Sequence, residues 1–68
     1  RASEQAVQAM YQTAAPALLA RYRVQYVVIG PQERRSLAAN EAAFERLHRR
    51  VKQSAQYSIY QVLRYPDH

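Results

Sequence analysis

The 68-residue sequence has no cysteine, no tryptophan and only one glycine. Without cysteine the chain can form neither a disulfide nor a thiolate-bound metal site, and its two histidines are too few for a structural zinc site. A single glycine also excludes the glycine-rich loops that bind phosphates, because each of those motifs needs more than one. We therefore expect no metal and no cofactor.

Groups that could carry catalysis are equally scarce. His48 lies between Leu47 and Arg49, where we predict a solvated position on the polar face of a helix. Glu41 and Glu45 are four residues apart, a spacing typical of surface charge patterning on a helix. No serine stands in a G-x-S-x-G setting; the four are Ser3, Ser36, Ser54 and Ser58. We predict that the chain is not an enzyme by itself.

The chain also lacks a long hydrophobic run. The uncharged stretch Gln5–Ala20 contains Gln, Thr and Pro, and it falls short of the ~20 apolar residues that a membrane span needs. A chain of this length forms one domain and buries only about 60% of its unfolded surface. We expect residues 1–68 to be one small domain, soluble when isolated, and either a piece of a larger protein or a homodimer.

Acidic residues are few relative to basic ones. Ten Lys and Arg against five Asp and Glu give a net charge of +5, and nine of the ten basic residues are Arg. Such an excess favours anionic partners, although a solvated basic surface is the commoner explanation for it. Tyrosines interleave with arginines, as on some nucleic-acid platforms, but no RNA-binding signature is present, and their spacing fits core and cross-strand pairing better. We do not predict nucleic-acid binding as the main function. These tyrosines are Tyr22, Tyr57, Tyr60 and Tyr65.

Two short helices are predicted at the start of the chain. Ser3 is a suitable N-cap for the first, which should end near Thr13, and Pro16 fits the first turn of the second. Their apolar stripes are Ala6, Val7, Met10 and Tyr11 in the first helix, and Leu18, Leu19 and Tyr22 in the second.

The segment Val24–Ile29 predicts a β-strand, since it is rich in β-branched and aromatic residues. Only Gln25 is polar, a pattern typical of a central strand covered on both faces. Gly30-Pro31 ends the strand, because proline cannot donate to a sheet ladder. The single glycine indicates a backbone requirement, either a positive φ or a close approach of another group.

The second half predicts a loop, a helix and a hairpin. Gln32–Ser36 is the loop; Asn40 caps a helix from Glu41 to about Arg50, with Val51 on its buried stripe. Weak and strong strand patterns follow at 51–54 and 57–63, joined by a turn at Ala55-Gln56, and 67–68 form a loose tail. The predicted fold is α/β (α+β), in the order α-α-β-α-β-β. Its three-stranded mixed sheet is packed by helices, with a right-handed crossover and a final antiparallel strand.

The carboxyl end of the predicted central strand is the best candidate for a contact site. Ligands of open α/β sheets bind beyond the carboxyl ends of strands, and a helix N-terminus with two arginines can hold an anion. Alternatively, the one glutamate there pairs with an arginine and fixes the loop. The candidate anion or interface contacts are Gly30, Pro31, Glu33, Arg34 and Arg35.

Several segments resemble one family. Ala17–Arg34 contains a leucine pair, a basic-aromatic step, a valine-tyrosine-valine strand and then Gly-Pro-x-Glu-Arg. Phe44–Leu47, Ser58–Val62 and, weakly, Met10–Thr13 extend the likeness. The chain resembles the C-terminal part of the bacterial and archaeal "YYY" multi-pass membrane proteins, which are similar to C-type glycosyltransferases that use lipid-phosphate sugar donors.

The resemblance implies a soluble, extracytoplasmic tail after the last membrane spans, and it carries over no catalytic residue. Arg1 is not a methionine, so we expect a chain cut from the C-terminus of a larger protein. The implied role is that of an accessory domain that packs on the transmembrane part of its own parent chain, or helps to position a lipid-linked sugar or anionic headgroup. Glu33, Arg34 and Arg35 would make the contacts. The alternative is an independent basic module, either monomeric or dimeric, that binds an anionic ligand or nucleic acid.

Overall fold

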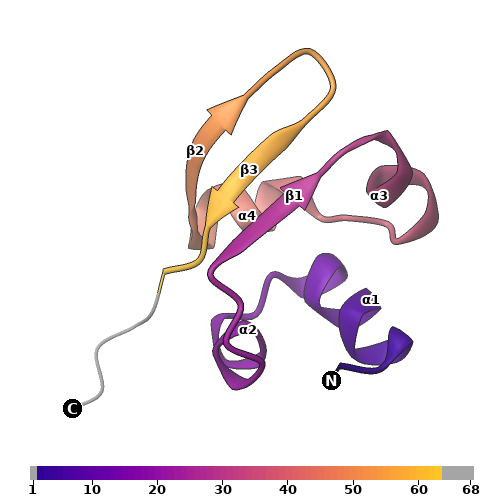
Figure 1. Cartoon of the computed structure of the whole chain (residues 1–68), viewed down its shortest axis with the longest axis vertical. Coiled ribbons are helices and arrows are strands. Elements are labelled where there is room, and N and C mark those ends of the chain that lie inside the picture. The colour runs from indigo at the N-terminus through magenta and orange to yellow at the C-terminus, as the bar shows by residue number, and fades with distance from the viewer. Residues whose placement is uncertain (1, 64–68) are drawn as a thin grey trace.

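The chain folds into four helices and a three-stranded sheet in a computed structural model that describes residues 2–63 (Figure 1). The predicted α+β order is confirmed, with one additional helix, α3. Residues 64–68, which include the predicted tail and Tyr65, lie outside the described part. No helix within 2–63 has the length and apolar character needed to cross a membrane. The elements are α1 Glu4–Thr13, α2 Pro16–Arg21, β1 Tyr26–Ile29, α3 Pro31–Ser36, α4 Glu41–Leu47, β2 Arg49–Gln53 and β3 Ser58–Gln61.

The sheet has the strand order β1-β3-β2, and both pairs of neighbours are antiparallel. β1 and β2 therefore run in the same direction but are separated by β3. The predicted return of the last strand through a hairpin is confirmed: the Ser54 N–H donates to the Tyr57 carbonyl at 2.8 Å across the turn. The expectation of a mixed sheet centred on Val24–Ile29 is wrong, because β3 follows β2 through this tight turn and fills the place beside β1.

β1 is an edge strand and is covered on one face only. It spans Tyr26–Ile29 instead of the predicted Val24–Ile29, and Val27 and Ile29 are buried. Tyr26 and Val28, which alternate with them, remain 56% and 44% exposed. The apolar run indicated cover on both faces, but alternate side chains of a strand point to opposite sides and helices lie over only one. In Figure 1, α4 lies behind the sheet.

The helix starts follow the predicted caps. The Ser3 hydroxyl accepts a hydrogen bond from the Ala6 N–H at 3.1 Å, and the Asn40 side chain accepts one from the Ala43 N–H at 3.1 Å. Each bond satisfies a backbone donor that the first turn of a helix leaves free. α1 ends at Thr13, where Ala14 turns into the left-handed region with φ 55°, and Pro16 begins α2 as predicted.

Two boundaries in the second half differ from the sequence prediction. The segment 32–36, predicted as a loop, belongs to helix α3, which begins at Pro31 and has no apolar stripe that periodicity could detect. α4 ends at Leu47 instead of Arg50, so Arg49, Arg50 and Val51 belong to β2. Val51 was expected on the buried stripe of the helix, but it is exposed beside a register shift in the β2–β3 pairing. Pairing with β3 outweighs the helical pattern there.

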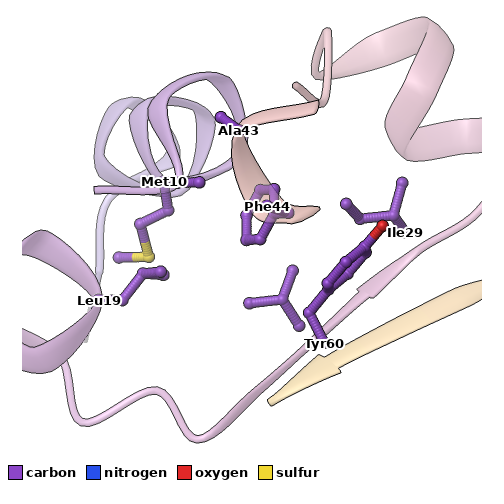
Figure 2. Close-up of a cluster of buried hydrophobic side chains, with 8 residues drawn as sticks. Met10, Leu19, Ile29, Ala43, Phe44 and Tyr60 are labelled. Atoms are coloured by element: carbon purple, nitrogen blue, oxygen red, sulfur yellow. The ribbon is translucent and has the colours of Figure 1, made fainter. Parts of the chain in front are cut away.

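The core is a cluster that joins α1, α2 and α4 to β1 and β3 (Figure 2). The Phe44 ring lies near its middle, with ring centroids 5.5 Å from Tyr60, 5.6 Å from His48 and 6.4 Å from Tyr11. Aromatic pairs at such separations add to the stabilisation from burial. The buried apolar residues are Met10, Ala14, Leu19, Val27, Ile29, Ala43, Phe44 and Tyr60.

The hydroxyl of Tyr60 is buried and has no hydrogen-bond partner among the described residues. Burial raises the pKa of this phenol, and the Glu45 and Glu41 carboxylates raise it further while Arg50 opposes them. A polar atom without a partner in the core destabilises the folded state. Tyr60→Phe should therefore leave the free energy of unfolding unchanged, or raise it by up to about 1–2 kcal/mol, in urea denaturation followed by far-UV circular dichroism.

Phe44→Ala serves as the opposite control, since it removes the ring from the middle of the core. It should lower the free energy of unfolding by about 3–5 kcal/mol, most of what a domain of this size has. Marked destabilisation by Tyr60→Phe would show that the Tyr60 hydroxyl has a hydrogen-bond partner in solution. It would contradict the description of this hydroxyl as unpaired.

Candidate functional site

Arg34, a predicted contact residue, joins three parts of the fold. Its Nε and NH2 donate to Glu41 Oε1 and Oε2 at 2.6 and 3.2 Å, a two-point pair between α3 and the start of α4. Its NH1 donates to the Gln56 carbonyl in the β2–β3 turn at 2.6 Å. The side-chain hydrogen bond to Glu41 also raises the pKa of Arg34 above its usual value. Three of its donors are thus engaged within the protein.

Gly30 and Glu33 form the turn from β1 into α3, where Pro31 occupies the first helical position. The Glu33 carboxylate accepts a hydrogen bond from the Gly30 N–H at 2.7 Å, which fixes this helix start. Gly30 has an extended backbone with φ −126°, so the positive-φ explanation of the glycine is wrong. The close-approach explanation is confirmed, since a Cβ at this position would lie 2.6 Å from Cδ1 of the Tyr57 ring.

The structure thus brings the predicted contact residues together, but gives most of them internal partners. Glu33 bonds to the backbone of Gly30, not to an arginine, and Arg34 bonds to Glu41. Arg35 is exposed on α3. A helix of six residues supplies little dipole for an anion. An anion contact at this edge stays a prediction, and Arg35 is the residue there with the most freedom to make it.

His48 is buried, whereas the sequence predicted a solvated position for it. It is 5% exposed and lies just after α4. Its Nε2–H donates to the Ala14 carbonyl at 2.7 Å, and its Nδ1 accepts from the Leu63 N–H at 3.1 Å, which together define a neutral ring protonated at Nε2. The imidazole therefore connects the α1–α2 linker to the residues after β3. The two polar bonds explain its burial, and no local sequence signal indicated them.

The strand pairing shows which side chains occupy the uncovered face of the sheet. Directly opposed residues point to the same side. In β3, Tyr60 and Ser58 point into the core, so Gln61 and Ile59, which alternate with them, point to the uncovered face. The residues paired with Gln61 and Ile59 on β1 and β2 point to the same face. This open face consists of two rows, Arg49–Gln61–Tyr26 and Lys52–Ile59–Val28, running from β2 through β3 to β1.

The open face is positive on one side and apolar on the other. Arg49 and Lys52 form its β2 column, and none of the three strands contains a carboxylate. Arg50, on the helix-covered side, lies 3.6 Å from Glu45 of α4, which agrees with the assignment of faces. Within the described residues, no ion pair involves Arg49 or Lys52.

A hollow of about 320 Å³ adjoins the apolar side, along the free edge of β1. The Tyr11 hydroxyl donates to the Val28 carbonyl at 3.0 Å and so covers part of this edge. Burial raises the pKa of Tyr11, and the charge of Glu33 adds to the shift, so the phenol stays protonated and able to donate. The lining residues are Met10, Tyr11, Leu19, Val24, Tyr26, Val27 and Val28. Two of these, Tyr26 and Val28, also belong to the open face.

The described residues contain no group of three or more His, Asp or Glu side chains placed to hold a metal ion. The open face carries cations, one phenol, one amide and aliphatic groups, but neither a carboxylate nor an imidazole. Such a surface can contact a partner through charge and apolar groups, but these groups do not form a nucleophile–base pair.

We predict that Arg34 stabilises the fold and Arg35 does not. Arg34→Gln should lower the thermal unfolding midpoint, because it removes the two-point pair with Glu41 and the bond to the hairpin turn. Arg35→Gln removes the same charge from the adjacent position and should leave the midpoint nearly unchanged. Circular dichroism melts of both variants make the comparison, and equal midpoints for them would contradict the structural role of Arg34.

Comparison with known proteins returned no match to any family model, to any curated protein or to any solved structure. The contacts of Arg34 with Glu41 and Gln56, and the open face, therefore rest on their own geometry and chemistry.

Proposed function

We propose that this chain is a non-catalytic accessory domain of a larger membrane protein and that the open face is its contact surface. The observation that carries the proposal is the sheet covered on one side only. Tyr26 and Val28 stay about half exposed although they alternate with fully packed neighbours. Exposed apolar side chains gathered on one face mark a surface that gains stability when a partner covers it.

The proposal of a non-catalytic role is supported by how the polar groups are used. The His48 ring is bonded through both nitrogens, and Glu33 and Glu41 hold the backbone of Gly30 and the side chain of Arg34. A general base must reach a substrate proton, and a group engaged in this way inside the fold is poorly placed to do so.

The proposed parent is a multi-pass protein of the "YYY" type, in keeping with the resemblance of Ala17–Arg34 and Ser58–Val62. In that setting the domain lies outside the cytoplasm and packs on the transmembrane part of its own chain, or helps to position a lipid-linked substrate. The open face is better suited to this contact than the Gly30–Arg35 edge, where Arg34 already has internal partners.

An independent basic binding module is the second candidate. It is favoured by the two cations of the open face, Arg49 and Lys52, which form no ion pair within the described residues. The two candidates differ in what precedes Arg1 in the gene.

The reading frame upstream of the Arg1 codon provides the test. We predict several hydrophobic segments there, each of about 20 residues, sufficient to span a bilayer. Sequencing the gene checks this directly. An initiation codon immediately before Arg1, or an upstream region without hydrophobic segments, would contradict the accessory-domain proposal and leave the independent module.

A further inference from the structure

The open face combines cations and apolar groups at fixed positions. Neighbouring strands lie about 4.8 Å apart, so Arg49 and Lys52 on β2 stand roughly 10 Å from Tyr26 and Val28 on β1. Ile59 and Gln61 of β3 lie between the two columns. The result is a small surface with an apolar side, a cationic side and a mixed centre.

Charge complementarity points to an anionic partner. The four carboxylates of the described residues all lie on helices: Glu4 in the first turn of α1, and the others on α3 and α4. Three of them are engaged by Gly30, Arg34 and Arg50. Nothing acidic on the sheet therefore offsets Arg49 and Lys52, and an anion approaching this face meets no repulsion from a strand residue.

The apolar side distinguishes between kinds of anionic partner. Single-stranded nucleic acid binds to series of aromatic rings on which successive bases stack. This face presents one ring, Tyr26, beside the aliphatic side chains of Val28 and Ile59. A bilayer surface suits that set better, since tyrosine is favoured at the interface, aliphatic groups leave water there, and the long stems of Arg and Lys carry their charges to headgroups.

We propose that the open face binds the surface of a membrane that contains anionic phospholipid. Tyr26, Val28 and Ile59 lie against the interface, and Arg49 and Lys52 contact the phosphate-bearing headgroups. The inference rests on the proposed function, because it uses the same face, and it names the partner that covers it. In the parent protein this contact orients the domain with α4 directed away from the bilayer.

The test is co-sedimentation of the chain with phosphatidylcholine vesicles, with and without phosphatidylglycerol. We expect binding only with phosphatidylglycerol, and weaker binding as salt is raised, because salt screens exposed charges. Arg49→Gln should lower the partition coefficient about fivefold, and adding Lys52→Gln should lower it about fivefold again. All variants should keep the circular dichroism spectrum of the unsubstituted chain, since the Arg49 and Lys52 side chains are exposed.

Arg46→Gln is the matched control. It removes the same charge three residues earlier, from the exposed side of α4, and should change the partition coefficient much less. Equal losses for Arg46→Gln and Arg49→Gln would show that net charge, not the open face, drives binding. Absence of vesicle binding, with tight binding of a single-stranded oligonucleotide or dimerisation through this face instead, would also overturn the inference. Hydrophobic segments upstream of Arg1 would still uphold the proposed function.

Discussion

Phe44 sets the side of the sheet on which the helices lie, and most of the architecture depends on that contact. Its ring packs against Tyr60 of the central strand, His48 and Tyr11, so α4 and α1 meet the same face of the sheet. Once Tyr60 points toward Phe44, strand alternation directs Val27 and Ile29 inward and Tyr26 and Val28 outward. Within residues 2–63 no further helix covers the second face, which therefore stays open.

Side-chain hydrogen bonds connect segments that so small a core does not hold together by itself. His48 links the α1–α2 linker to the residues after β3, while Arg34 links α3, α4 and the hairpin turn. Both side chains belong to types commonly associated with binding or catalysis. Here their partners are backbone carbonyls, a backbone N–H and one carboxylate, so their contribution lies in holding segments distant in sequence. These bonds leave the open face of the sheet free.

Local signals predicted much of the fold, whereas tertiary pairing decided the rest. The caps at Ser3 and Asn40, the first-turn proline Pro16 and the turn at Ala55-Gln56 each involve neighbouring residues, and each was predicted correctly. The central place of β3, the early end of α4 and the burial of His48 depend on partners about 10 to 35 residues away, which no local pattern contains. For the same reason the sequence indicated the Gly30–Arg35 edge but not the open face, whose rows assemble only when three strands pair.

Alternate residues of β1 and β3 face a packed core and an open surface. Methyl NMR with a soluble paramagnetic agent tests it most directly, because the agent broadens signals that it can approach. We predict strong broadening for the Val28 methyls, partial broadening for Ile59 and protection for Val27 and Ile29. Protection of Val28 with broadening of Val27 would mean that the strand is shifted by one residue, and would contradict both the register and the open face.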